Sequence, residues 1–177
     1  MNIHPMIVHF PVALLTVYSL MELVRFRKIN SNDVWFYIKS FVIVVGTLGS
    51  YAAFMAGDPA AHIYRQAHPE MRSILGLHET WAGITVTIFS IIAVIYLVQV
   101  LRKAGYVEKI KNIPIIGSVW NIVSAISDFM FKPSIMVTLA LAGLLSVTLT
   151  GAFGGTLVYG STSDPFISLV NKIFIGK

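Results

Sequence analysis

The residues best suited to chemistry in this 177-residue chain are histidines at the ends of apolar runs. His4 and His9 open the first run, and His78 lies one turn into the third. A neutral imidazole is a good ligand for metals and haem and is rare in hydrocarbon. A buried imidazole also needs a hydrogen-bond partner, because burying it unpaired is costly. The three histidines therefore predict either a ligand site or hydrogen bonds between helices.

A bis-histidine b-type haem needs two imidazoles from separate helices at one depth. We expect His9 and His78 to be the axial ligands of the haem iron, with His4 a second ligand or an orienting group. Arg65 and Arg72 would pair with the haem propionates, because arginine binds carboxylates in bidentate geometry. The alternatives stay open: imidazoles bonded within the bundle, and arginines in solvent or at lipid headgroups.

Other polar residues accompany these histidines. Glu79 follows His78 directly, and Asp58 closes the second apolar run. Either carboxylate would orient a ligating imidazole through its second nitrogen, or would be an ordinary charge at a membrane boundary. His62 and His68 fall in the expected loop between the second and third runs. We read each as a solvated side chain, and the two together as a candidate second site.

The absence of other motifs narrows the chemistry. The sequence has no cysteine, which excludes disulfides, thiolate metal sites, iron–sulfur clusters and the attachment of a c-type haem. It contains no phosphate-binding Walker loop, no GxSxG elbow and no HExxH helix. It also lacks an ExxH pair, which argues against a ferritin-like di-iron bundle.

Composition places the chain in the membrane class. Hydrophobic residues make up 56% of it and charged residues 12%, against about a quarter charged in a soluble domain. The length predicts a single domain over residues 1–177. The net charge of +5 does not indicate nucleic acid, because the basic residues bracket the apolar runs, as they do in membrane proteins.

The apolar runs predict an all-α fold, an integral membrane four-helix bundle. A crossing helix needs about 20 apolar residues, and the runs give spans at about 6–24, 36–57, 77–101 and 135–158. Residues 113–131 have an apolar and a polar face at helical spacing. This pattern favours an amphipathic helix in the membrane interface over a fifth span. Residues 165–177 predict a short C-terminal interfacial helix in the same way.

The basic residues are divided unequally between the two sides of this arrangement. One side holds nine of the thirteen: Arg25, Arg27, Lys28, Lys39, Arg102, Lys103, Lys109, Lys111 and Lys132. The other side holds Arg65, Arg72, Lys172 and Lys177. By the positive-inside rule the richer side is cytoplasmic, so both termini and all five histidines lie on the outer side.

Four segments resemble those of a known family: the opening IHPMIVHFPVALL, then AAFMAGD, LHETWAG and GGTLVYG. The chain is similar to the DUF2231 family of small predicted bacterial membrane proteins, whose members begin with an HP-hydrophobic-VHFP pattern. The resemblance implies a four-helix protein of the bacterial inner membrane, often suspected of binding haem, with no established reaction. It carries over to His4, His9 and His78, with Glu79 beside the last. Family members often have further polar residues after the last segment, where this chain has Gly160, Ser161 and Thr162.

The leading hypothesis is a cytochrome-like subunit that holds haem b near the outer face. It would pass electrons between an outer partner and the quinone pool or a larger redox complex. The main alternative is a non-catalytic scaffold or accessory subunit of a respiratory complex, with hydrogen-bonded histidines and no cofactor. A small transporter ranks third, because the spans hold few polar residues. Whether the protein is an enzyme is left open, with an electron-transfer or accessory role favoured.

Overall fold

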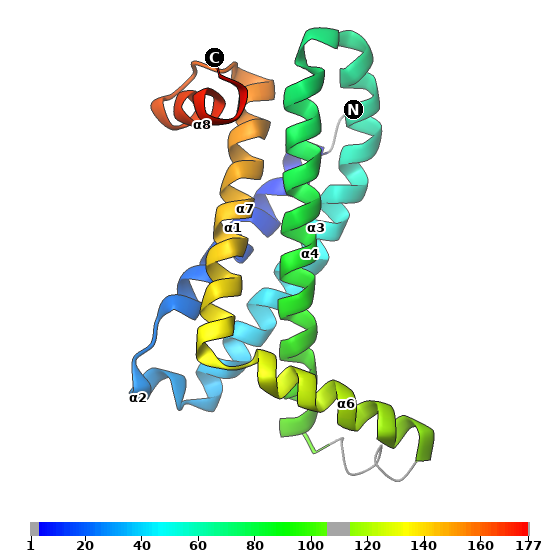
Figure 1. Cartoon of the computed structure of the whole chain (residues 1–177), viewed down its shortest axis with the longest axis vertical. Helices are drawn as coiled ribbons and strands as arrows, with labels where there is room; N and C mark the ends of the chain where they lie inside the picture. The colour runs from blue at the N-terminus through cyan, green and yellow to red at the C-terminus, as the bar shows by residue number, and fades with distance from the viewer. Residues whose placement is uncertain (1–3, 106–113, 177) are drawn as a thin grey trace.

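The computed structural model describes residues 4–105 and 114–176, and that part of the chain is helical without strands (Figure 1). Its elements are α1 (His4–Leu23), α2 (Arg27–Asn30), α3 (Asp33–Ala67), the 3-10 turn η1 (Pro69–Met71), α4 (Arg72–Lys103), α6 (Pro114–Met130), α7 (Pro133–Tyr159) and α8 (Pro165–Ile175). Residue 113 of the expected interfacial helix lies outside the described residues, as do Lys109, Lys111 and Lys177 of the charge count.

Four of the described helices, α1, α3, α4 and α7, are long and apolar enough to cross a membrane. They pack together as a bundle, which confirms the predicted all-α four-helix membrane fold. The start of α1 and the helix α8 lie toward one end of the bundle, here called the terminal end (Figure 1). The short helix α2 and the helix α6 lie at the opposite end, here called the α6 end.

The connection between the second and third spans differs from the expected loop. Helix α3 continues to Ala67, and α4 already begins at Arg72, with only η1 between them. The 35 residues of α3 correspond to roughly 50 Å at 1.5 Å per residue, more than the hydrocarbon thickness of about 30 Å. The prediction of a polar loop was therefore wrong. A helix satisfies its own backbone hydrogen bonds, so it can project beyond the membrane with polar side chains.

Helix α6 lies across the α6 end of the bundle and not alongside the four long helices (Figure 1). Its large apolar side chains are exposed: Ile116, Val119, Ile122, Ile126 and Phe129. Such an uncovered apolar face is what an interfacial helix presents to lipid. Helix α8 contacts α7 at the terminal end and buries Ile167 and Val170.

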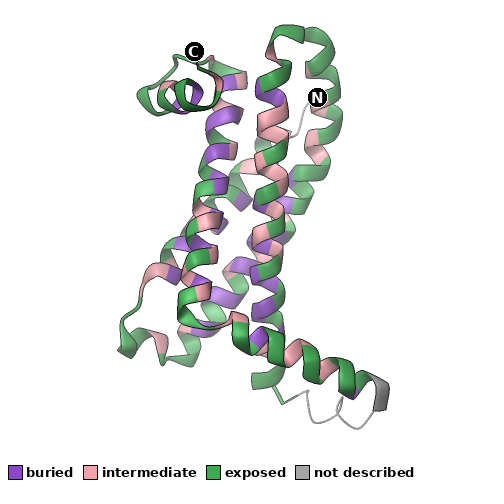
Figure 2. Ribbon diagram, viewed as in Figure 1, coloured by how far each residue is buried: buried purple, intermediate pink, exposed green. Residues whose placement is uncertain are grey.

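The core lies where the four long helices meet, and the residues that face outward are mostly exposed (Figure 2). Its centre contains the fully buried rings of Tyr18, Phe89 and Tyr96. Close approach depends on glycine: a Cβ added at Gly143 would lie 2.7 Å from Phe89 Cζ. Small residues at such contacts let membrane helices pack closely, and this contact joins α4 to α7.

Candidate functional site

His4 is bonded to the neighbouring helix α3 at the terminal end. Its Nδ1 lies 2.9 Å from the carbonyl oxygen of Ala53. A carbonyl only accepts, so Nδ1 carries the proton, and Nε2 holds the lone pair in the neutral ring. The imidazole lies over Gly57, where an added Cβ would come within 3.1 Å of the ring atom Cε1. Helices α1 and α3 together therefore set the orientation and tautomer of this histidine.

His78 has the same arrangement on the other pair of helices. Its Nδ1 lies 3.0 Å from the carbonyl oxygen of Thr150 on α7, so this nitrogen is also the donor. A Cβ added at Gly154, one turn along α7, would come within 3.1 Å of its Cε1. The two histidines thus share a tautomer, a backbone partner on the adjacent helix, and a glycine beside the ring.

Of the two histidines of α1, His4 is the one whose charge acts on His78. His4 and His78 lie close enough for their charges to interact. His9 lies five residues further along α1, a rotation of about 140° around the helix axis, and its side chain is exposed. Both candidate first-helix histidines lie in α1, but they face different directions.

The expected propionate partners are also placed by α3 and α4. Arg65 Nη2 lies 2.7 Å from each carboxylate oxygen of Glu79, so these two side chains form an ion pair between the helices. They line an open pocket of about 450 Å³ together with Asp58 and His62. Arg72 is exposed at the first residue of α4. Glu79 thus pairs with Arg65, although the sequence suggested a role in orienting His78.

His62 and His68 are placed in different surroundings. His62 lines the pocket beside Arg65, whereas His68 caps the C-terminus of α3. The ring of His68 lies 4.5 Å from that of Tyr64, and its Nδ1 lies 3.3 Å from Glu70 Oε1. Within the described ranges, no group of three or more histidine, cysteine or acidic side chains is arranged to hold a metal ion.

Sequence reasoning missed a buried ionic cluster toward the α6 end. The Glu22 side chain is only 2% exposed. Its Oε2 accepts hydrogen bonds from Lys39 Nζ at 2.9 Å and from the Tyr96 hydroxyl at 2.7 Å, and its Oε1 lies 2.5 Å from Arg25 Nη2. The Tyr18 hydroxyl approaches Oε2 at 3.4 Å. Three spans, α1, α3 and α4, therefore meet at one carboxylate.

The sequence held a signal for this cluster. Glu22 and Lys39 are opposite charges inside the ends of consecutive apolar runs, and ionisable groups within membrane helices usually face the bundle and pair with one another. The charge count alone assigns Lys39 only to the cytoplasmic side. The hairpin between α1 and α3 brings the two residues together.

A smaller polar cluster lies between these sites, on α4 and α7. Thr85 Oγ1 lies 3.1 Å from both Ser146 Oγ and Thr150 Oγ1, and it donates to the Trp81 carbonyl. Thr150 thus has its hydroxyl in this cluster while its carbonyl accepts from His78. Next to this cluster, the ring of Phe89 lies against Gly143 and edge-on to the ring of Tyr18.

These features define a class: a multi-pass helical membrane protein with ionisable side chains inside its bundle. The sequence matches the family described as "Predicted membrane protein (DUF2231)" over residues 1–162, and the chain belongs to that family. No curated protein and no solved structure matches it.

Proposed function

We propose that this protein is a membrane cytochrome that holds one haem b between His4 and His78 and transfers electrons. The observation that carries the proposal is the matched pair of imidazoles, each fixed by a backbone hydrogen bond from Nδ1. Histidine ligands usually donate their other ring N–H to a carbonyl or carboxylate, which fixes the tautomer and raises ligand basicity. His4 and His78 both make such a hydrogen bond to a backbone carbonyl.

The number of ligands favours haem over an isolated metal ion. A structural zinc site takes four protein ligands and a catalytic site three, whereas haem iron needs only two axial ligands from the protein. In the described part of the chain, the charges of His4 and His78 act on each other, and no larger group of candidate metal ligands is present. Two imidazoles, each oriented by a hydrogen bond to a neighbouring helix, therefore fit a haem better than an isolated metal ion.

The rings of His4 and His78 each lie directly against a glycine of the neighbouring helix. Any side chain at Gly57 or Gly154 would press on the imidazole and change its orientation. Arg72 is exposed at this end and would meet a propionate, whereas Arg65 would have to leave Glu79 to do so. His9 would be a haem ligand only if α1 rotated about its own axis.

The haem and the protein chain would make different contributions to electron transfer. A bound haem would supply one-electron exchange, and the chain would supply ligation and a low-dielectric site that tunes its potential. We place the protein in the bacterial inner membrane with its terminal end on the outer side, from the count of basic residues. Electrons would then pass between an outer partner and quinone or a larger membrane complex.

An accessory subunit without a cofactor is the competing function. The same two hydrogen bonds would then serve only to join α1 to α3 and α4 to α7. Chemical extraction of the purified protein distinguishes the two functions. We expect about one haem b per chain, with a large loss in His4→Ala and in His78→Ala but not in the exposed variant His62→Ala. Assembled protein without haem, when haem is supplied during expression, would overturn the proposal.

A further inference from the structure

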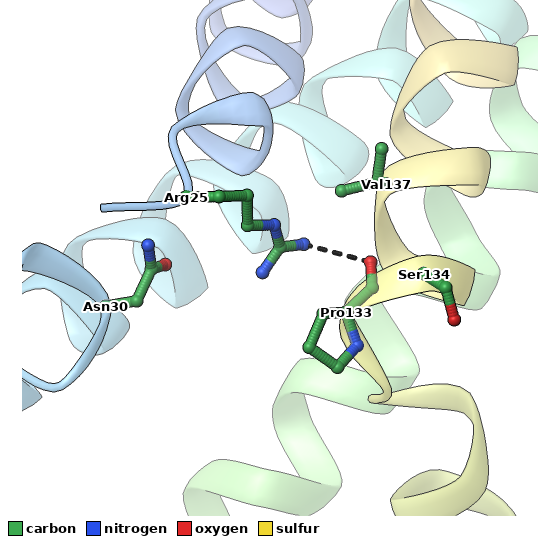
Figure 3. Close-up of a pocket in the computed structure, with 5 residues that line it drawn as sticks. All are labelled: Arg25, Asn30, Pro133, Ser134 and Val137. Atoms are coloured by element: carbon green, nitrogen blue, oxygen red, sulfur yellow. Dashed lines mark hydrogen bonds between the residues drawn. The ribbon is translucent and has the colours of Figure 1, made fainter. Parts of the chain in front are cut away.

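An open pocket lies at the α6 end, where α1 and α2 meet the start of α7 (Figure 3). It has a volume of about 480 Å³ and is lined by Arg25, Asn30, Pro133, Ser134 and Val137. We call it the arginine pocket. Arg25 reaches across it from the end of α1 toward Pro133 (Figure 3). The terminal-end histidines are at the opposite end of the bundle, so this pocket is a separate feature.

Arg25 is held in place by two hydrogen bonds. Its Nη2 lies 2.5 Å from Glu22 Oε1 and 3.2 Å from the Pro133 carbonyl oxygen. Both bonds use the same nitrogen, and a guanidinium has further donors on Nε and Nη1. The side chain is 33% exposed, so it is fixed in orientation and remains open to a ligand.

The charge around Arg25 is not balanced by the ionic cluster. Glu22 supplies one negative charge to two cations, Lys39 and Arg25. The other described acidic side chains at this end are paired elsewhere, Asp33 with Lys103 and Asp128 with Arg102. A positive charge therefore remains beside a pocket whose walls include the apolar side chains of Pro133 and Val137.

We propose that the arginine pocket binds the phosphate of an anionic phospholipid and that an acyl chain of this lipid lies along Val137. Basic pockets between membrane helices on the cytoplasmic side are suited to anionic headgroups. Arginine binds phosphate in bidentate geometry, and Arg25 lies beside the first turn of α7, where the helix dipole favours an anion. The apolar wall can contact the acyl chain of a lipid. Free phosphate has no acyl chain, so it would lack this contact.

The lipid retained by the full-length purified protein tests this proposal. Vesicle lipid containing equal phosphatidylglycerol and phosphatidylcholine is added, and bound lipid is counted by native mass spectrometry. We expect phosphatidylglycerol to be retained preferentially, and Arg25→Gln to reduce that retention about fivefold or more. Arg27→Gln is the matched control. It removes the same charge, but Arg27 lies two residues further along the chain and does not line the pocket. It should reduce retention clearly less than Arg25→Gln does.

A second variant covers the case in which Arg25→Gln fails to fold through its contact with Glu22. Val137→Trp fills the pocket and keeps both hydrogen bonds of Arg25, so it should also lose the bound lipid. Equal losses in Arg25→Gln and Arg27→Gln would overturn the proposal, since they indicate diffuse surface charge. Equal retention of phosphatidylcholine, unchanged retention in Val137→Trp, or displacement of the lipid by millimolar inorganic phosphate would overturn it as well.

Discussion

Glu22 Oε2 and Lys39 Nζ lie 2.9 Å apart, and this ion pair joins α1 to α3 inside the bundle. Both side chains are almost fully buried, so neither charge has water as an alternative partner. Taking two charges out of water is costly, and the pair depends on the further bonds from Tyr96 and Arg25 to make the arrangement favourable. This contact explains why a lysine lies within an otherwise apolar span.

Removing the cation alone should destabilise the protein strongly. Lys39→Met leaves the Glu22 carboxylate buried with one fewer partner, and we expect a loss of about 3 kcal/mol, at the lower end for a broken buried pair because Arg25 remains. The double variant Glu22→Gln, Lys39→Met should recover part of that loss. Reversible denaturation in detergent measures both. Equal losses in the single and double variants would show that the lysine acts through packing alone.

The Tyr96 hydroxyl should contribute measurably through its hydrogen bond to Glu22. Tyr96→Phe removes a donor 2.7 Å from a buried carboxylate and keeps the ring that packs against Tyr18. A bond to a charged group is worth about 1.5–3 kcal/mol, so a loss of that size is expected. Tyr51→Phe, which removes an exposed hydroxyl bonded to Ser90, should cost less than about 0.5 kcal/mol. The same denaturation experiment compares the two variants.

The tight contact between α4 and α7 predicts a requirement for glycine at position 143. Gly143→Ala would place its Cβ 2.7 Å from Phe89 Cζ, and we expect a loss of about 1–3 kcal/mol from overpacking. Gly151→Ala on the same helix meets nothing within 4 Å and should be neutral or slightly stabilising. Thermal unfolding checks both. Rescue of Gly143→Ala by Phe89→Leu would confirm the cause, and failure of that rescue would contradict it.

The glycine beside His78 should matter for the cofactor more than for folding. In Gly154→Ala the new methyl group would lie 3.1 Å from the His78 Cε1 atom and press on the ring. We expect lower haem content or an altered absorption spectrum in protein that still assembles. Gly151→Ala is the control on the same helix. A normal spectrum in Gly154→Ala would mean that the orientation of His78 is unimportant.

The length and apolarity of the runs predicted the four spans, because a membrane fixes how many apolar residues a crossing helix needs. The polar residues at 58–76 were less informative. They are typical of a loop, yet Asp58, His62 and Arg65 lie on α3, which simply continues beyond the apolar stretch. A hydropathy profile indicates where a helix leaves the membrane. It does not indicate the residue at which the helix ends.

The side-chain sites depend on features that periodicity does not determine. The sequence predicts that the histidines of α1 and α4 lie at one end, but the rotation of α1 decides whether His4 or His9 is turned toward the bundle. That rotation is set by packing, since His4 bonds Ala53 and lies over Gly57. The Glu22–Lys39 pair likewise needs the hairpin geometry, because 17 positions separate the two residues.

We propose that His4 and His78 would hold the haem iron. The most direct measurement is the dithionite-reduced minus oxidised absorption spectrum of the purified wild type beside His4→Ala, His78→Ala and His9→Ala. We predict the Soret and sharp α bands of a six-coordinate b-type haem in the wild type and in His9→Ala, and their loss in the other two variants. Absence of these bands from the wild type, or their loss in His9→Ala with His4→Ala unaffected, would contradict the account.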